Sequence, residues 1–181
     1  GSGFLVAKGT ADLKGPLSME IGGKDMDAGI LAAWLDTPAE IQGKLDFTAQ
    51  LGGTATSPQA GLSVEIRNGG VTNATFDELF GLFVLKDEII QVNQLYITKG
   101  EHRASMYGKL PLKALNRKGR SGASDADVMD LRLRLDQANL SILPLLSPEV
   151  QWASGATRGE VLIGGTLAHP IFGGGISVVD G

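Results

Sequence analysis

The 181-residue chain has no cysteine, which excludes disulfide bonds and thiolate metal ligands. Aromatic residues are scarce, at 6%, and no apolar run approaches the roughly 18 residues that a membrane-spanning helix needs. The net charge is only −4 and both signs are dispersed, so a nucleic-acid partner is not expected. Glycine, by contrast, is abundant, with 26 residues and no collagen-like period. This balance favours a thin, curved β-sheet with many turns and bulges.

No motif indicates catalysis or metal binding. His102 and His169 lie 67 positions apart (169 − 102) without an acidic partner at ligand spacing, and we expect both in turns. Asp125 and Asp127 are not followed by the spacing of a calcium loop. The run Gly173–Gly175 precedes neither a helix nor a phosphate-binding lysine, and no Gly-x-Ser-x-Gly elbow occurs. We therefore predict no enzyme activity, no metal and no cofactor.

Alternation with a period of two dominates the chain. Leu17, Met19 and Ile21 alternate with polar neighbours, and residues 62–67 and 131–136 repeat the pattern. Such alternation is typical of a strand with one buried face. About 12–14 short strands are expected. A one-residue slip in the apolar pattern near Asn93–Gln94 predicts a β-bulge.

Other segments follow from caps and turn residues. Asp27 and Asn139 are good helix N-caps, and short helical turns are expected over 28–35 and 140–146. Residues 70–112 are expected to form a meander, and the polar stretch 116–127 a flexible loop. Gly1-Ser2-Gly3 is expected to be a cloning remnant, and 4–181 a single repeat-built segment of a longer protein.

An internal repeat relates residues 27–69 to residues 139–181. A Gly-Gly-Thr-x-x-x-Pro turn followed by an alternating strand occurs twice at a constant offset, since 165 − 53 = 112 and 170 − 58 = 112. Nine positions are identical, and six of them are Gly or Pro, so the repeat preserves backbone geometry rather than side-chain chemistry. A chain that repeats strands and turns in this way is predicted to have a repetitive all-β architecture.

The apolar residues of the strands fall on one side only. If the sheet curls so that all of them face inward, they line a hydrophobic trough; a closed β-sandwich with an ordinary core is the alternative. The candidate groove residues are Leu17, Met19, Ile21, Leu45, Phe47, Leu62, Val64, Ile66, Leu131, Leu133, Leu135, Val161, Ile163, Ile176 and Val178.

At its two glycine-rich turns the chain resembles the TamB family of translocation and assembly module proteins, which are related to AsmA-like proteins. The resemblance rests on the cadence of QLGGTATSPQAGLSVEIRNG and VLIGGTLAHPIFGGGISVVDG, with QLYITKG and MYGKLPL between them. It implies an elongated, open β-groove folded like a taco shell. The implied function is to conduct phospholipids through the periplasm between the inner and outer membranes, in support of outer-membrane biogenesis.

The resemblance also implies partners. Phospholipid acyl chains would occupy the groove, and a BamA-type outer-membrane barrel protein would bind elsewhere on a parent protein anchored in the inner membrane. A different hypothesis is a chaperone or scaffold whose sheet edges pair with strands of outer-membrane proteins. A carbohydrate-binding sandwich is a third hypothesis, but Trp34 and Trp152 lie beside apolar turns rather than in an exposed aromatic cluster.

Overall fold

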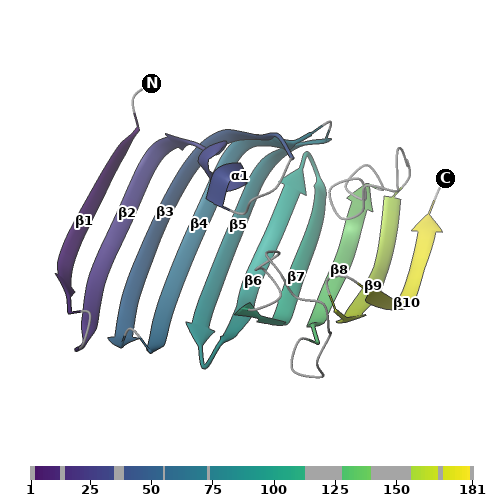
Figure 1. The fold of residues 1–181 in the computed structure, drawn as a ribbon. Coiled ribbons are helices and arrows are strands. Elements are labelled where there is room, and N and C mark those ends of the chain that lie inside the picture. The colour runs from purple at the N-terminus through teal and green to yellow at the C-terminus, as the bar shows by residue number, and fades with distance from the viewer. Residues whose placement is uncertain are drawn as a thin grey trace.

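The computed structural model describes residues 3–12, 15–34, 39–54, 56–72, 74–112, 128–139, 156–166 and 169–179. In this part of the chain ten strands form one antiparallel sheet, and each strand lies next to its neighbour in sequence (Figure 1). The elements are β1 Phe4–Ala11, β2 Leu17–Asp27, α1 Ile30–Trp34, β3 Ile41–Thr54, β4 Ser57–Val71, β5 Ala74–Lys86, β6 Ile89–Lys99, β7 His102–Pro111, β8 Asp130–Asn139, β9 Ala156–Gly165 and β10 Pro170–Val179.

The sheet is open, as the groove hypothesis predicts. The strand order runs from β1 to β10 without a crossover, and β1 does not pair with β10. A closed sandwich would need two sheets packed face to face, so that alternative is wrong. The described strands are fewer and longer than expected, because runs separated by glycine continue as single strands; β3 has 14 residues and β4 has 15.

Bulges and glycines interrupt the regular pleat. Five of the nine strand pairings contain a register shift. One of them confirms the bulge expected near Asn93–Gln94, because Leu82 pairs with Gln94 while Phe83 pairs with Val92. Gly9, Gly108 and Gly174 adopt φ of 132°, 138° and 108° within strands, and a Cβ there would collide with a backbone carbonyl of the neighbouring strand. Bulges and glycine kinks of this kind are what bend a sheet.

The helix α1 lies against the sheet in front of β3 and β4 (Figure 1). The side chain of Asp27 begins it, since the N–H of Gly29 donates to Asp27 Oδ1 at 2.8 Å, as expected of an N-cap residue. The N–H of Ala28 donates to the carbonyl of Gly43 at 3.0 Å and ties the helix to β3. Ile30 and Leu31 pack on the core of the sheet, and Leu45 beneath it is 0% exposed.

The two Gly-Gly-Thr-x-x-x-Pro sequences form hairpin turns with matching contacts. Gly53 pairs with Pro58 in the β3–β4 hairpin, and Gly165 pairs with Pro170 in the β9–β10 hairpin. Both glycines have positive φ, 82° and 73°. The threonine that follows each glycine accepts a hydrogen bond at 3.1 Å from a backbone N–H three residues later, that of Ser57 in the first turn and of His169 in the second.

Several expected segments can be compared with the structure. The meander predicted over 70–112 corresponds to β5, β6 and β7, and the first predicted helical turn is α1. The second helical turn, over 140–146, and the polar loop 116–127 lie outside the described residues.

Candidate functional site: a one-sided apolar face

Most of the predicted groove residues are buried or half-buried on one face of the sheet. Seven are at most 9% exposed, six are half-buried, and Ile176 on the edge strand is 44% exposed. Val178 belongs to β10, but its side chain lies outside the described part of the structure. The buried residues are Leu45, Phe47, Val64, Ile66, Leu131, Leu133 and Leu135, and the half-buried ones are Leu17, Met19, Ile21, Leu62, Val161 and Ile163.

The strand register brings these residues together. Phe47 pairs with Val64 across β3 and β4, and Leu133 pairs with Val161 across β8 and β9. A sheet puts directly paired residues on the same face, so apolar side chains of adjacent strands meet. The predicted residues, which come from positions far apart in the chain, therefore belong to one surface.

Three buried clusters make up this surface, and shared side chains connect them. The first centres on Leu45 and Ile66, the second on Leu133 and Leu135, and the third on Val92 and Leu131. Ile97 packs against both the first and the second cluster, and Phe83 against both the first and the third. The apolar face is therefore continuous from β2 to β9. We call it the apolar face below.

Sequence reasoning missed the middle of the apolar face. Val92 and Ala104 are 5% and 3% exposed, and Phe83, Ile97 and Met106 pack against the clusters that contain them. Leu79 packs against the first cluster, and none of these six residues was among the predicted groove residues. The bulge on β6 breaks the alternation there, and Phe76–Leu85 also has helical spacing. Ala104 and Met106 alternate regularly with polar neighbours, and this alternation could have identified these two residues from the sequence.

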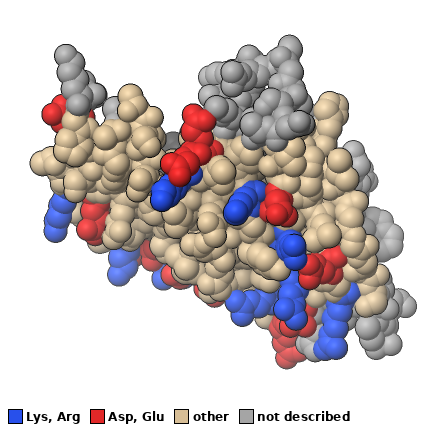
Figure 2. Space-filling view, turned by 90° about the horizontal axis from the view of Figure 1, so that it is seen from below, with Lys and Arg blue, Asp and Glu red and all other residues tan. Residues whose placement is uncertain are grey.

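The opposite face of the sheet, which we call the polar face below, carries ion pairs between neighbouring strands. Arg67 Nη2 lies 3.1 Å from Asp25 Oδ1 and 2.9 Å from Asp46 Oδ2, and Arg67 Nε lies 3.7 Å from Glu65 Oε1. The arginine thereby links β2, β3 and β4. Because these side chains are partly exposed, each pair is worth at most about 1 kcal/mol. Figure 2 shows a band of charged side chains along the lower side of that view.

An aromatic contact stabilises the polar face around Tyr96. Its ring stacks on Phe80 with 5.3 Å between ring centroids, and the guanidinium of Arg103 lies 4.2 Å above it. The hydroxyl donates to Glu78 Oε1 at 3.0 Å. Burial raises the pKa of Tyr96, and the hydrogen bond to the Glu78 carboxylate raises it further.

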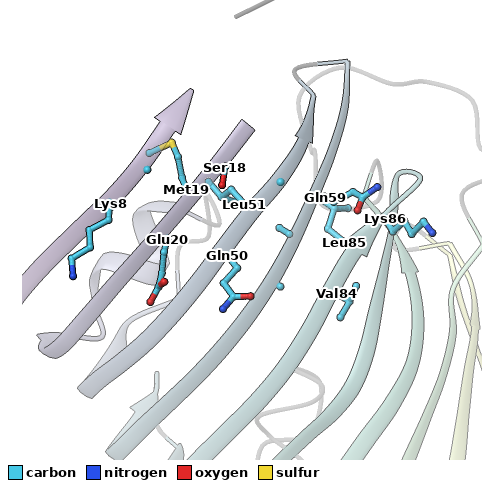
Figure 3. A pocket seen from close by; sticks show the side chains of 14 residues that line it. Lys8, Ser18, Met19, Glu20, Gln50, Leu51, Gln59, Val84, Leu85 and Lys86 are labelled. Atoms are coloured by element: carbon cyan, nitrogen blue, oxygen red, sulfur yellow. The ribbon is translucent and has the colours of Figure 1, made fainter. Parts of the chain in front are cut away.

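Two open hollows lie mainly over the polar face. The larger, of about 620 Å³, spans β1 to β5 and is lined by Lys8, Glu20, Gln50 and Lys86 among others (Figure 3). The second, of about 400 Å³, includes Phe4 and Phe80. Gly52 and Gly61 are among the residues that line the first hollow, and Gly22 and Gly23 are among those that line the second. Within the described residues no group of three or more His, Cys, Asp or Glu could hold a metal ion.

Neither a protein-family model, nor a curated protein, nor a solved structure matches this chain. The apolar face is therefore the feature of this chain that bears on its function. No helix among the described residues is long and apolar enough to cross a membrane.

Proposed function

We propose that this chain is part of a periplasmic β-groove that shields phospholipid acyl chains and conducts them between the inner and outer membranes, as the resemblance to the TamB family implies. One observation carries the proposal, namely an apolar face that continues across neighbouring strands of an open sheet. A sheet with one apolar face must cover it, and an elongated apolar ligand covers an elongated apolar face.

The energetics of acyl chains suit conduction. Removing a methylene from water is worth about 0.8 kcal/mol, so one lipid chain gains on the order of 10 kcal/mol on entering an apolar groove. A lipid gives up a similar amount when it leaves a bilayer. The net free energy of transfer is therefore small, and the lipid is not trapped in the groove.

The chemistry of the apolar face favours tails over headgroups. The described ion pairs of Arg67 lie on the opposite face, and the residues that pack in the three clusters are aliphatic, methionine or phenylalanine. A phosphate headgroup would find no cationic partner there and would remain in solvent. Selectivity would then depend on the acyl chain more than on the headgroup.

The half-buried side chains of the apolar face are those that a tail would contact without displacing other residues. Leu17, Met19 and Ile21 on β2 and Val161 and Ile163 on β9 are half-buried, whereas Leu45 and Leu133 are buried against neighbouring side chains. A tail that entered over β2 or β9 would displace water from those half-exposed side chains. Passage over the middle would also require α1 to give way, because Ile30 and Leu31 pack there.

Photo-crosslinking at neighbouring positions of opposite parity tests this proposal. A photoreactive residue at Leu62 is on the apolar face, and one at Ser63 is on the polar face. We expect phospholipid to be captured from Leu62 and not from Ser63, both in cells and with phospholipid vesicles. Equal capture from the two positions would exclude a one-sided lipid path.

A charge on the same strand gives a second test. Leu62→Arg keeps its aliphatic stem against the sheet and can extend its guanidinium into water, so the protein should remain folded. A passing acyl chain would nevertheless meet a charge, and lipid transfer should stop. Ser63→Arg is the matched control and should transfer lipid normally. Normal transfer by folded Leu62→Arg would contradict the proposal.

A further inference from the structure

The connection between β2 and β3 is longer than a hairpin requires. It spans residues 28–40, whereas each of the connections that join β3 through β7 has two residues. Two residues are enough to join antiparallel strands. In the described part of this connection the chain forms α1, which lies against the sheet and packs on the apolar face (Figure 1). The additional length therefore brings a helix onto the surface that we assign to acyl chains.

The helix α1 covers the most enclosed part of the apolar face. Ile30 and Leu31 pack against the first cluster, in which Leu45 is 0% and Ile66 4% exposed. None of the described residues of α1 belongs to the second or the third cluster. A tail that follows the apolar face across the strands therefore meets α1 over the first cluster.

Backbone hydrogen bonds fasten the connection on either side of α1. The N–H of Ala28 donates to the carbonyl of Gly43 at 3.0 Å, and the N–H of Thr72 donates to the carbonyl of Glu40 at 2.7 Å. Among the hydrogen bonds between described residues, none joins residues 30–33 to a strand. In this part of the chain, side-chain packing is what holds α1 against the sheet.

Packing of this kind can be exchanged for a lipid tail. Apolar contacts are not directional, and an acyl chain offers the same kind of surface as Ile30 and Leu31. A helix of five residues is not stable without its tertiary contacts. Gly29 lies between the tether at Ala28 and the helix, and glycine leaves the backbone free to change direction there. Moving α1 off the apolar face would break no strand pairing.

We propose that α1 is a displaceable lid, which covers the first cluster when the apolar face is empty and leaves it when an acyl chain arrives. The lid rests on the proposed function, because it acts on the same apolar face. Without lipid it keeps water away from Leu45 and Ile66. With lipid it competes with the tail, so the apparent affinity of a tail over β3 and β4 falls with the fraction of molecules in which the lid is closed.

Thiol labelling at neighbouring helix positions tests the displacement, because the chain has no native cysteine. Ala32→Cys introduces a half-buried thiol and Ala33→Cys an exposed one. On addition of monomeric lysophosphatidylcholine, a small maleimide should label Ala32→Cys severalfold faster, and the rate for Ala33→Cys should change little. Unchanged or slower labelling of Ala32→Cys would mean that α1 stays in place, and would overturn the proposal.

A weaker lid should bind tails better, whereas a damaged wall of the groove would bind them worse. Leu31→Asn removes one of the side chains that hold α1 down. A photoreactive residue at Leu62, which packs against the first cluster, should then capture about fivefold more lysophosphatidylcholine, because the lid is open in more molecules. Ala33→Asn, at an exposed position of the same helix, is the matched control and should leave capture unchanged. Unchanged or reduced capture with folded Leu31→Asn would contradict a lid.

A second photoreactive position separates the lid from lipid binding itself. Val161 on β9 packs against the second cluster, to which no described residue of α1 belongs. Capture at Val161, combined with a contrary result in either measurement on α1, would overturn the lid and leave the proposed function standing. Absence of capture at both Val161 and Leu62, in the Leu31→Asn variant as well as in the wild type, would contradict both.

Discussion

The two glycine-rich hairpins have the same turn but different surroundings. In both, a positive-φ glycine pairs with proline and a threonine hydroxyl accepts a backbone hydrogen bond at 3.1 Å. The strand after the first turn, β4, lies between β3 and β5, whereas β10 pairs only with β9 among the described strands. At equivalent positions, 112 residues apart (176 − 64), Val64 is 8% and Ile176 44% exposed.

This difference separates what a local sequence controls from what the sheet controls. The turn is set by glycine conformation and by a hydrogen bond within four residues, so it forms in the same way in both places. The burial of the following strand depends on a second neighbouring strand, which comes from a distant part of the chain. The same sequence pattern can thus end in a core or on an edge.

The largest difference in stability between the two hairpins should come from a charge placed at the two equivalent positions. Val64→Asp places an unpaired carboxylate among Phe47, Leu62 and Ile66, and should lower the free energy of unfolding by about 3–5 kcal/mol. Ile176→Asp can hydrate at the edge and should cost less than about 0.5 kcal/mol. Urea denaturation of both variants measures this, and equal losses would show that β10 is as enclosed as β4.

Substituting the turn glycines should cost less stability than the buried charge. The number of strands that lose amide protection should differ between the two turns. Alanine at Gly53 or Gly165 has to adopt a positive φ and its Cβ meets the carbonyl oxygen of Ser57 or His169, at a cost of about 1–3 kcal/mol. We expect Gly165→Ala to reduce amide protection mainly in β9 and β10, because β10 is an edge strand. Gly53→Ala should lower protection across the central sheet. Hydrogen exchange that shows the same local loss for both variants would contradict this.

Replacing the turn threonines should lower stability by less, and by a similar amount in the two hairpins. Thr54→Ala and Thr166→Ala each remove one hydrogen bond to a backbone N–H, worth about 0.5–1.5 kcal/mol, and the two losses should be similar. Serine at either position keeps the hydroxyl and should restore most of the stability. Thermal denaturation is the measurement, and a threonine whose removal has no effect would indicate that its turn is held in another way.

The smallest expected effect is a pH dependence of stability that arises from Tyr96 on β6 and its partner Glu78 on β5. The pKa of Tyr96 is raised by burial and by its bond to Glu78, so the folded state favours the neutral phenol. The associated stability is present below the unfolded pKa of 10.0 and is lost as the pH rises through the higher folded pKa. The wild type should therefore lose stability above about pH 10 more steeply than Tyr96→Phe. Stability curves of the two proteins that run parallel from pH 8 to 11 would contradict the assignment.

The fold was largely predictable from the sequence, and the apolar face only in part. Alternation such as Leu131-Arg132-Leu133 identifies both a strand and the face that it buries, and the helix cap at Asp27 is a local signal as well. The contribution of β5 to β7 was missed because a bulge changes which parity points inward. The covering of Leu45 by α1 could not be predicted, since a five-residue helix gives no indication of the surface on which it packs.

The sequence by itself determined the alternation of strands, the bend at the bulge near Asn93 and the two identical turns. These depend on glycine conformation, side-chain period and hydrogen bonds between residues close in the chain. Only the tertiary structure decided that the strands form one open sheet, that Val64 is buried while Ile176 is exposed, and that β1 and β10 lie at the two edges of the described sheet. Burial and edges depend on which strands become neighbours, and that is a property of the assembled sheet.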